Sequence, residues 1–374
     1  MVSNLIIFGT RPEAIKMAPL IKAFQNEDTV FNTKVCITAQ HREMLDQVLN
    51  FFEIKPDFDL NLMKPDQNLY SLTGDIITGL RPVLEEFKPT YVYVHGDTTT
   101  TMASSIAAFY SGAKVCHVEA GLRTFNKRAP FPEEVNRTIT GSVCDYHFAP
   151  TTISRQNLLN ENIPSEHILV TGNTVIDALE FSVNKVTAPN FKDEEIDFLK
   201  GILSDTKRII LVTGHRRENH GEGFIRICNA LKDIAELYED VQIIYPVHLN
   251  PNVQKPVFEL LSNIPNINLI NPLSYPAFVW LMEKSHLIIT DSGGVQEEAP
   301  SLGKPVLVMR DTTERPEAVN AGTVKLVGTD KDKIISETKK LLDSPQTYQE
   351  MSKLHNPYGD GMACKRIVQF IKEL

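Results

Sequence analysis

Short, almost uninterrupted hydrophobic runs recur along the chain, each followed by a turn and then by a helical pattern. The runs predicted as strands are Leu5–Phe8, Lys34–Thr38, Tyr91–His95, Lys114–Val118, Tyr146–Ala149, Ile168–Thr171, Arg208–Thr213, Gln242–Val247, Ile267–Ile270, Leu287–Thr290, Pro305–Met309 and Val324–Val327. Runs without polar alternation are typical of strands buried on both faces of a parallel sheet. Strand–helix alternation that occurs twice predicts an α/β fold with two doubly wound halves.

The segments between these runs include amphipathic helices and one polar stretch. The segment Arg42–Phe52 places Met44, Leu45, Val48, Leu49 and Phe52 on one face of a predicted helix. By contrast, Lys185–Asp205 has few large apolar residues and contains Pro189 and a charged run. That composition favours an exposed helix or linker, so we expect the two halves to join between Asn173 and Lys207.

The composition excludes several classes of protein. Of the 374 residues, 42% are hydrophobic and 23% are charged, which is typical of a globular protein and not of a disordered or fibrous one. The formal net charge of −9 argues against a nucleic-acid partner, because phosphate backbones would be repelled on average. We therefore expect any anionic ligand to be bound by a few local arginines and lysines.

Cysteine usage and the N-terminal sequence favour a cytoplasmic protein. The five cysteines are scattered and form no CxxC pair, so neither a disulfide framework nor a structural zinc site is expected. The N-terminus lacks the pattern of a signal peptide, and no apolar stretch approaches the length of a membrane span. We expect a reducing compartment and no membrane contact.

Polar residues follow several predicted strands in the first half, at the sheet edge where ligands bind in open α/β folds. Gly9–Lys16 begins a helix and carries Arg11 and Lys16, which either bind an anion or are merely solvated. Asp97 and Glu119 follow neighbouring strands, and Glu133 follows a turn bracketed by prolines. Asp97 could simply cap the next helix, but carboxylates that share a crevice favour proton transfer.

The second half offers groups that suit a phosphate. His215, followed by two arginines, comes after its first strand. Ser292, Gly293 and Gly294 lie between a strand and a helix, where backbone N–H groups converge on an anion. Arg315 adds a guanidinium suited to a diphosphate. The chain has no GxGxxG after the first strand and no P-loop, HExxH or GxSxG motif. These patterns predict an enzyme that acts on a nucleotide-linked diphosphate substrate in a cleft between the halves.

The motifs together resemble a known family. They are GTRPEAIKMAP, TAQHREMLDQVL, HGDTTTT, HVEAGLRT, PFPEE, TGNTVIDAL, TGHRREN, YPVHLNP, TDSGGVQEEAPSLGKPVLV, RDTTERPEA and NPYGDG. They run in order over nearly the whole chain, and the sequence resembles the non-hydrolysing bacterial UDP-N-acetylglucosamine 2-epimerases. The resemblance implies two Rossmann-like domains in the glycosyltransferase-B arrangement, residues 1–172 and 173–355, with a C-terminal helix in 356–374 that packs on the first. It also implies a homodimer without a metal or other cofactor.

The resemblance further implies a reaction and its residues. The reaction interconverts UDP-N-acetylglucosamine and UDP-N-acetylmannosamine by elimination of UDP, through a 2-acetamidoglucal, and supplies bacterial surface polysaccharides. Asp97, Glu119 and Glu133 would be the acid–base set, with His215 at the leaving phosphate. The residues implied in UDP binding are Arg11, Lys16, Phe278 on the uracil, Ser292, Gly293, Gly294, Glu298 on the ribose, and Arg315.

A second UDP-N-acetylglucosamine activates some relatives, and the resemblance places a possible regulatory contact here. The matching residues are Gln40, His41, Gln67, Arg216 and His248. Glu43 and Asp66 depart from strongly regulated members, so we expect weaker activation. The loop Phe125–Ala129 also departs from the family, which leaves the geometry before Glu133 open.

Three alternatives remain. A glycosyltransferase of the same fold would keep the UDP site, although transfer needs at most one base and the chain offers three carboxylates. A hydrolysing epimerase would release free N-acetylmannosamine, but such enzymes commonly carry a fused kinase for which this chain has no room. A nucleotide-sugar sensor without activity would have no need of Asp97, Glu119, Glu133 and His215 together.

Overall fold

The computed structural model describes residues 1–38, 42–64 and 67–374 and divides into two compact units. Unit 1 comprises Met1–Ala178 and Tyr358–Leu374, and unit 2 comprises Leu179–Pro357. The chain therefore changes unit within a few residues of the proposed domain limits at 172/173 and 355/356. Among the described residues, no helix combines the length and apolarity needed to cross a membrane.

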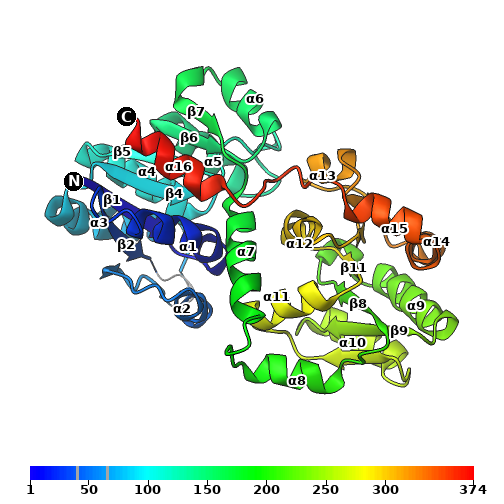
Figure 1. Cartoon of the computed structure of the whole chain (residues 1–374). Helices are drawn as coiled ribbons and strands as arrows, with labels where there is room; N and C mark the ends of the chain where they lie inside the picture. The colour runs from blue at the N-terminus through cyan, green and yellow to red at the C-terminus, as the bar shows by residue number, and fades with distance from the viewer. Residues whose placement is uncertain (39–41, 65–66) are drawn as a thin grey trace. The chain divides into compact units, whose positions relative to one another are not determined.

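Unit 1 contains a seven-stranded parallel sheet in the order β3-β2-β1-β4-β5-β6-β7 (Figure 1). The strands are β1 (Val2–Phe8), β2 (Phe31–Ile37), β3 (Phe58–Asp59), β4 (Tyr91–His95), β5 (Lys114–Val118), β6 (Tyr146–Ala149) and β7 (Ile168–Val170). The helices are α1 (Arg11–Gln25), α2 (Arg42–Phe51), α3 (Leu69–Phe87), α4 (Thr99–Ser111), α5 (Glu133–Val143), α6 (Thr152–Asn160), α7 (Thr174–Val186), which continues into unit 2, and α16 (Ala363–Lys372). The C-terminal helix α16 packs beside α1, at the other end of the sequence (Figure 1).

Unit 2 repeats the same winding in a six-stranded parallel sheet, β10-β9-β8-β11-β12-β13. Its strands are β8 (Arg208–Thr213), β9 (Val241–Pro246), β10 (Ile267–Ile270), β11 (Leu287–Thr290), β12 (Val306–Val308) and β13 (Val324–Leu326). Its helices are α8 (Glu194–Ile202), α9 (Glu222–Leu237), α10 (Pro251–Leu261), α11 (Tyr275–Lys284), α12 (Gly293–Glu298), α13 (Pro316–Asn320), α14 (Lys331–Asp343) and α15 (Pro345–Ser352). The strand order 3-2-1-4-5-6 is that of a Rossmann-type sheet.

The predicted fold class is therefore confirmed for both halves. Every run predicted as a strand overlaps an observed one, because its side chains are buried between two helical layers. The two-residue strand β3 was missed because so short a segment shows no periodicity. The segment Lys185–Asp205, expected to be an exposed helix or linker, contains the helix α8, and the expectation of exposure was wrong in part because Ile196 and Leu199 on α8 are buried.

A tight turn after β5 requires glycine. Gly121 has a φ of +86°, and a Cβ at this position would lie 2.2 Å from the main-chain oxygen of Ser154. Both the left-handed backbone and the approach of another backbone exclude a side chain. The HVEAG motif thus has a structural reason for its glycine, two residues after Glu119.

Gly121→Ala should lower the free energy of unfolding by about 2–4 kcal/mol, because the variant combines backbone strain with an overlap that the structure must relieve. Gly112→Ala is the matched control: Gly112 also has a positive φ, +82°, but its added Cβ would have no atom within 4 Å. That control should cost about 1 kcal/mol. Urea unfolding measures both, and equal losses would contradict the steric argument.

Candidate functional site

Several predicted site residues follow the strands at which the winding of each sheet reverses, namely Arg11 after β1, Asp97 after β4, His215 after β8 and Ser292 after β11. In unit 1 the reversal falls between β1 and β4, and in unit 2 between β8 and β11. This position is where open α/β sheets bind ligands.

The loop after β1 is fixed by Glu13, which the sequence reading did not single out. Glu13 is buried, and its carboxylate accepts hydrogen bonds from the main-chain N–H groups of Gly9 and Thr10 at 3.0 and 2.8 Å. It also accepts from the hydroxyl of Thr98 at 2.6 Å, which ties the start of α1 to the start of α4. The spacing Thr10-x-x-Glu13 is a capping box and could have revealed this role.

Glu119 lies at the centre of the polar cluster in unit 1. Its backbone has a φ of +62°, which is rare for a residue with a side chain, and the residue is only 7% exposed. Its Oε2 pairs with Lys16 and accepts from Asn173 Nδ2 at 3.0 Å. Arg137 donates to its Oε1 at 3.1 Å and to its main-chain oxygen at 2.7 Å. A strained backbone held by so many contacts is typical of a functional position.

Arg137 also joins Glu119 to Asp97. Its Nε donates to Asp97 Oδ2 at 2.9 Å, and Asn136 donates to the main-chain oxygen of Asp97 at 2.8 Å. Asp97 does not cap α4, since that cap is Thr98. The Asp97 side chain is 31% exposed, compared with 7% for Glu119, and is the more accessible of the two.

The charges around Glu119 decide its protonation. Burial alone would raise its pKa, but the nearby cations, Lys16 first and Arg137 after it, hold the pKa well below the usual range. Glu119 is therefore ionised at neutral pH and a weak base. Lys16, expected beside a diphosphate, contacts this carboxylate instead of solvent.

The adjacent carboxylates Glu133 and Glu134 at the start of α5 have different surroundings. Glu134 accepts hydrogen bonds from the main-chain N–H groups of Thr124 and Phe125, both at 2.9 Å, and so supports the preceding loop. Glu133 lies one helical turn before Arg137, on the same face of α5. Within the described part of the chain, its buried Oε2 has no hydrogen-bond partner. Of the pair, Glu133 has the oxygen available for a ligand.

In unit 2, His215 follows β8 and is partly exposed. Its main-chain N–H donates to the buried carboxylate of Asp291 at 2.9 Å. The His215 ring stacks on that of His248, with 5.4 Å between centroids and 21° between planes. Burial lowers the pKa of His215, His248 and Arg216 lower it further, and Asp291 opposes them.

The segment Ser292–Gly294 begins α12 as predicted, with Ser292 as the N-cap. The guanidinium of Arg315 lies against Gly293, where its Cζ would be 3.5 Å from an added Cβ. Glu297, which the sequence reading passed over, accepts from Arg315 Nε at 2.6 Å and fixes this position. Glu298 is 9% exposed, and its Oε2 approaches Gly294. The predicted phosphate-binding residues of unit 2, Ser292–Gly294 and Arg315, thus lie together.

The other residues predicted to bind substrate or to regulate the protein lie on several different elements. Phe278, on the first turn of α11, is half-buried, and Arg11 is the first residue of α1. Gln40 and His41 lie outside the described residues, as does Asp66. Gln67 donates to the main-chain oxygen of Leu62 at 2.7 Å.

Two residues assigned to regulation lie at the predicted substrate residues of unit 2. His248 stacks on His215, and Arg216 Nη2 would lie 3.8 Å from a Cβ on Gly293. The sequence did not show these contacts, because they join loops after different strands.

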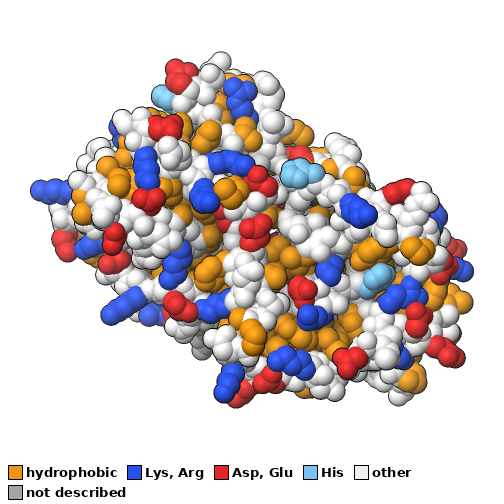
Figure 2. All heavy atoms as spheres, viewed as in Figure 1, with side chains coloured by type: hydrophobic (Ala, Val, Ile, Leu, Met, Phe, Trp, Pro, Cys, Tyr) orange, Lys and Arg blue, Asp and Glu red, His pale blue; other side chains and the backbone are white. Residues whose placement is uncertain are grey.

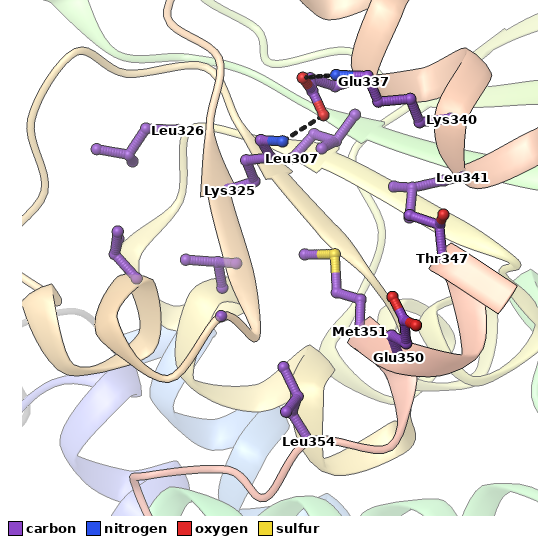
Figure 3. Close-up of a pocket in the computed structure, with 13 residues that line it drawn as sticks. Leu307, Lys325, Leu326, Glu337, Lys340, Leu341, Thr347, Glu350, Met351 and Leu354 are labelled. Atoms are coloured by element: carbon purple, nitrogen blue, oxygen red, sulfur yellow. Dashed lines mark hydrogen bonds and ion pairs between the residues drawn. The ribbon is translucent and has the colours of Figure 1, made fainter. Parts of the chain in front are cut away.

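A separate pocket of about 600 Å³ lies between β13, α14 and α15 (Figure 3). Apolar side chains such as Leu307, Leu341 and Met351 line it, and Glu337 at its rim pairs with Lys325 and Lys340. None of the predicted site residues lines this pocket. Charged side chains of both signs are mixed over the face shown in Figure 2, so charge alone does not mark the site.

Buried His95 beside Glu119 gives a testable pH dependence. Burial lowers its pKa from 6.5 to about 4, so the folded state lacks a proton that the unfolded state binds between these values. Stability should therefore fall as the pH drops from 6.5 to 4, by about 1.4 kcal/mol per pH unit from this group. His95→Gln should show a shallower slope in urea unfolding across this range, and identical slopes would contradict a neutral buried histidine.

Comparisons with known proteins identify the family to which the chain belongs. The family model described as UDP-N-acetylglucosamine 2-epimerase matches residues 22–372. The chain is 59% identical to the UDP-N-acetylglucosamine 2-epimerase of Escherichia coli strain K12 over 368 residues, 98% of each protein. The crystal structure of UDP-GlcNAc 2-epimerase from Neisseria meningitidis bound to UDP-GlcNAc matches with a TM-score of 0.89 and 54% identity, covering 100% of both chains. A Listeria monocytogenes structure, named as a putative UDP-N-acetylglucosamine 2-epimerase, matches at 47% identity with a TM-score of 0.92 over 100% of this chain and 96% of that one. Because the family model spans most of the chain and the curated relative is 59% identical over 98% of it, the chain belongs to the UDP-N-acetylglucosamine 2-epimerase family.

Proposed function

We propose that the protein interconverts UDP-N-acetylglucosamine and UDP-N-acetylmannosamine without hydrolysis. The observation that carries the proposal is the set of carboxylates near the carboxyl ends of β4 and β5: Asp97, which Arg137 joins to Glu119, and Glu133, whose Oε2 has no hydrogen-bond partner in the described chain. Inversion at C2 requires a proton to leave and return, and carboxylates supply such groups. The family match over residues 22–372 supports the same substrate.

The proposed reaction begins with elimination. A carboxylate removes the proton from C2, the electron pair of that C–H bond becomes the C1–C2 double bond, and the C1–O bond breaks with its pair leaving on UDP. The products are a 2-acetamidoglucal and UDP, with the proton held on the protein. In the reverse sense UDP adds to C1 and a proton is delivered to the other face of C2, which gives the epimer.

The surroundings of the three carboxylates indicate which of them transfers protons at C2. We assign proton transfer at C2 to Asp97 and Glu133, because both are partly accessible and Glu133 offers an oxygen without a hydrogen-bond partner in the described chain. Glu119 stays ionised between Lys16 and Arg137. Its role is to hold these cations in place beside the other carboxylates.

We assign UDP to the groups of unit 2. Ser292–Gly294 and Arg315 would bind the diphosphate, because N–H groups and guanidinium stabilise the charge that develops on the leaving oxygens. Glu298 would accept from the ribose hydroxyls and Phe278 would pack on the uracil. His215 would supply or accept a proton at the phosphate. The homodimer, the cytoplasmic location and the supply of surface polysaccharide stay predictions.

The first test follows hydrogen at C2. In deuterated water, UDP-N-acetylglucosamine incubated with the protein should yield both sugar nucleotides carrying deuterium at C2, without added metal or nicotinamide. Proton NMR measures the loss of the C2 signal. Epimer that keeps its original proton would contradict a solvent-exchanging base, and free N-acetylmannosamine as the main product would indicate a hydrolysing enzyme.

The second test separates chemistry from binding. Asp97→Asn should reduce turnover by roughly 10²-fold or more, as loss of general-base catalysis does, and leave UDP affinity almost unchanged. Arg315→Ala should weaken UDP binding by about 1.5–3 kcal/mol, because a charge-assisted hydrogen bond is lost. Calorimetry with UDP and a turnover assay measure the two effects.

Arg226→Ala is the matched control for Arg315→Ala. Arg226 is exposed on α9 and donates to Thr329, so its removal changes the net charge equally without touching the proposed UDP residues. Its UDP affinity should match the wild type. If Asp97→Asn lost UDP binding as severely as Arg315→Ala, the proposed division between the units would be wrong.

A further inference from the structure

Asp291 is the most deeply buried charged group beside the predicted phosphate residues, and the proposed reaction gives it no step. It follows β11 directly and has no exposed surface. Its Oδ2 accepts hydrogen bonds from the main-chain N–H groups of His215 and Arg216 at 2.9 and 2.8 Å, and from Asn219 Nδ2 at 3.3 Å. One carboxylate oxygen thus fixes the loop that follows β8.

The other oxygen of Asp291 faces the ring of His215. Oδ1 lies 3.4 Å from His215 Nδ1, and within the described part of the chain it has no hydrogen-bond partner. A carboxylate oxygen only accepts hydrogen bonds, so this neighbour favours a proton on Nδ1. The tautomer with Nδ1–H leaves Nε2 as the nitrogen that gains and loses a proton.

His248 restrains the same ring from another side. Its ring stacks on that of His215, and its Nδ1 accepts the main-chain N–H of Asn250 at 3.1 Å. A nitrogen that accepts carries no proton, so neutral His248 is protonated on Nε2. The stack limits rotation of the His215 ring, while Asp291 selects which of its nitrogens bears hydrogen.

We propose that Asp291 is a positioning residue that holds His215 as the Nδ1–H tautomer, with Nε2 directed to proton exchange at the leaving phosphate. The proposal rests on the proposed function for its chemistry, and on the contacts of Oδ1 and Oδ2 for its geometry. The same carboxylate aligns Arg216, whose side chain lies beside Arg315 at Gly293. Asp291 would act through these groups and touch no substrate itself.

The charged and titratable groups that face His215 come from three loops. They are Asp291 after β11, His248 after β9, and Arg216 in the same loop as His215. Burial, His248 and Arg216 lower the pKa of His215, whereas the negative charge of Asp291 raises it. Removing that charge should therefore move the titration of His215 to lower pH.

Asp291→Asn tests the proposal with little change of shape. The amide oxygen can keep both main-chain hydrogen bonds, while the NH₂ group then faces His215 Nδ1 and donates to it. This donor favours the opposite tautomer, with hydrogen on Nε2. Nitrogen NMR of the histidine rings in the full-length protein measures the tautomer directly, and the His215 signal is assigned as the one missing in His215→Asn.

We expect a protonated Nδ1 in the wild type and a protonated Nε2, with a lower titration midpoint, in Asp291→Asn. Asn219→Ala is the matched control, because it removes a contact to Oδ2 and leaves Oδ1 in place. It should retain the Nδ1–H tautomer even where it lowers stability. An unprotonated Nδ1 in the wild type, or an unchanged tautomer in Asp291→Asn, would overturn the proposal.

Turnover of UDP-N-acetylglucosamine supplies the second readout. Asp291→Asn should lower kcat by roughly 10²–10⁴-fold, the range that general acid–base catalysis contributes. A fall of about 10⁴-fold is known when the carboxylate partner of a catalytic histidine becomes an amide. In a His215→Asn background the same change should cost no further activity, because the effect passes through His215. A full additional loss there would show a general structural role and overturn the proposal.

The two readouts separate this inference from the proposed function. The tautomer is measured without any substrate, so it can be established even if the sugar nucleotide does not react. An inactive wild type with the expected tautomers would contradict the function alone, while normal epimerisation by Asp291→Asn would contradict the positioning role alone.

Discussion

The organisation of unit 1 depends on keeping a buried carboxylate ionised. Glu119 can stay charged with 7% exposure only because Lys16, Arg137 and Asn173 compensate the loss of water. Those same contacts place Arg137 of α5 against Asp97 and so bring together the residues that follow β4 and β5. Replacing Lys16 or Arg137 would leave the buried charge of Glu119 uncompensated, so the residues of this cluster depend on one another.

In unit 2 a buried carboxylate also fixes the groups around it, but its partners are mainly main-chain N–H groups. Asp291 is fully buried after β11, and its charge is met mostly by main-chain N–H groups of the loop after β8. The loop is thereby fixed to the neighbouring strand of the sheet. In both units a buried carboxylate at the end of a central strand sets the positions of more accessible groups, Asp97 in the first and His215 in the second.

Parallel winding explains why these groups gather. All strands of each sheet run in one direction, so their carboxyl ends lie along one edge, and the reversal of strand order leaves room there for side chains from adjacent loops. Glycine lets the backbones and side chains of these adjacent loops approach one another closely. A Cβ on Gly9 would lie 2.1 Å from Thr38 Oγ1, and one on Gly121 would strike the backbone at Ser154.

The sequence by itself determined every strand except β3, the family, and the strand ends that carry polar residues. Strands buried between two helical layers consist of continuous hydrophobic runs, and the family motifs are short stretches of adjacent residues, so both are visible in the sequence. Only the tertiary structure decided which polar residues meet. It distinguished Glu133 from Glu134, paired Lys16 with Glu119, and stacked His248 on His215. These contacts join segments distant in sequence, and no local pattern records the distance between two strand ends.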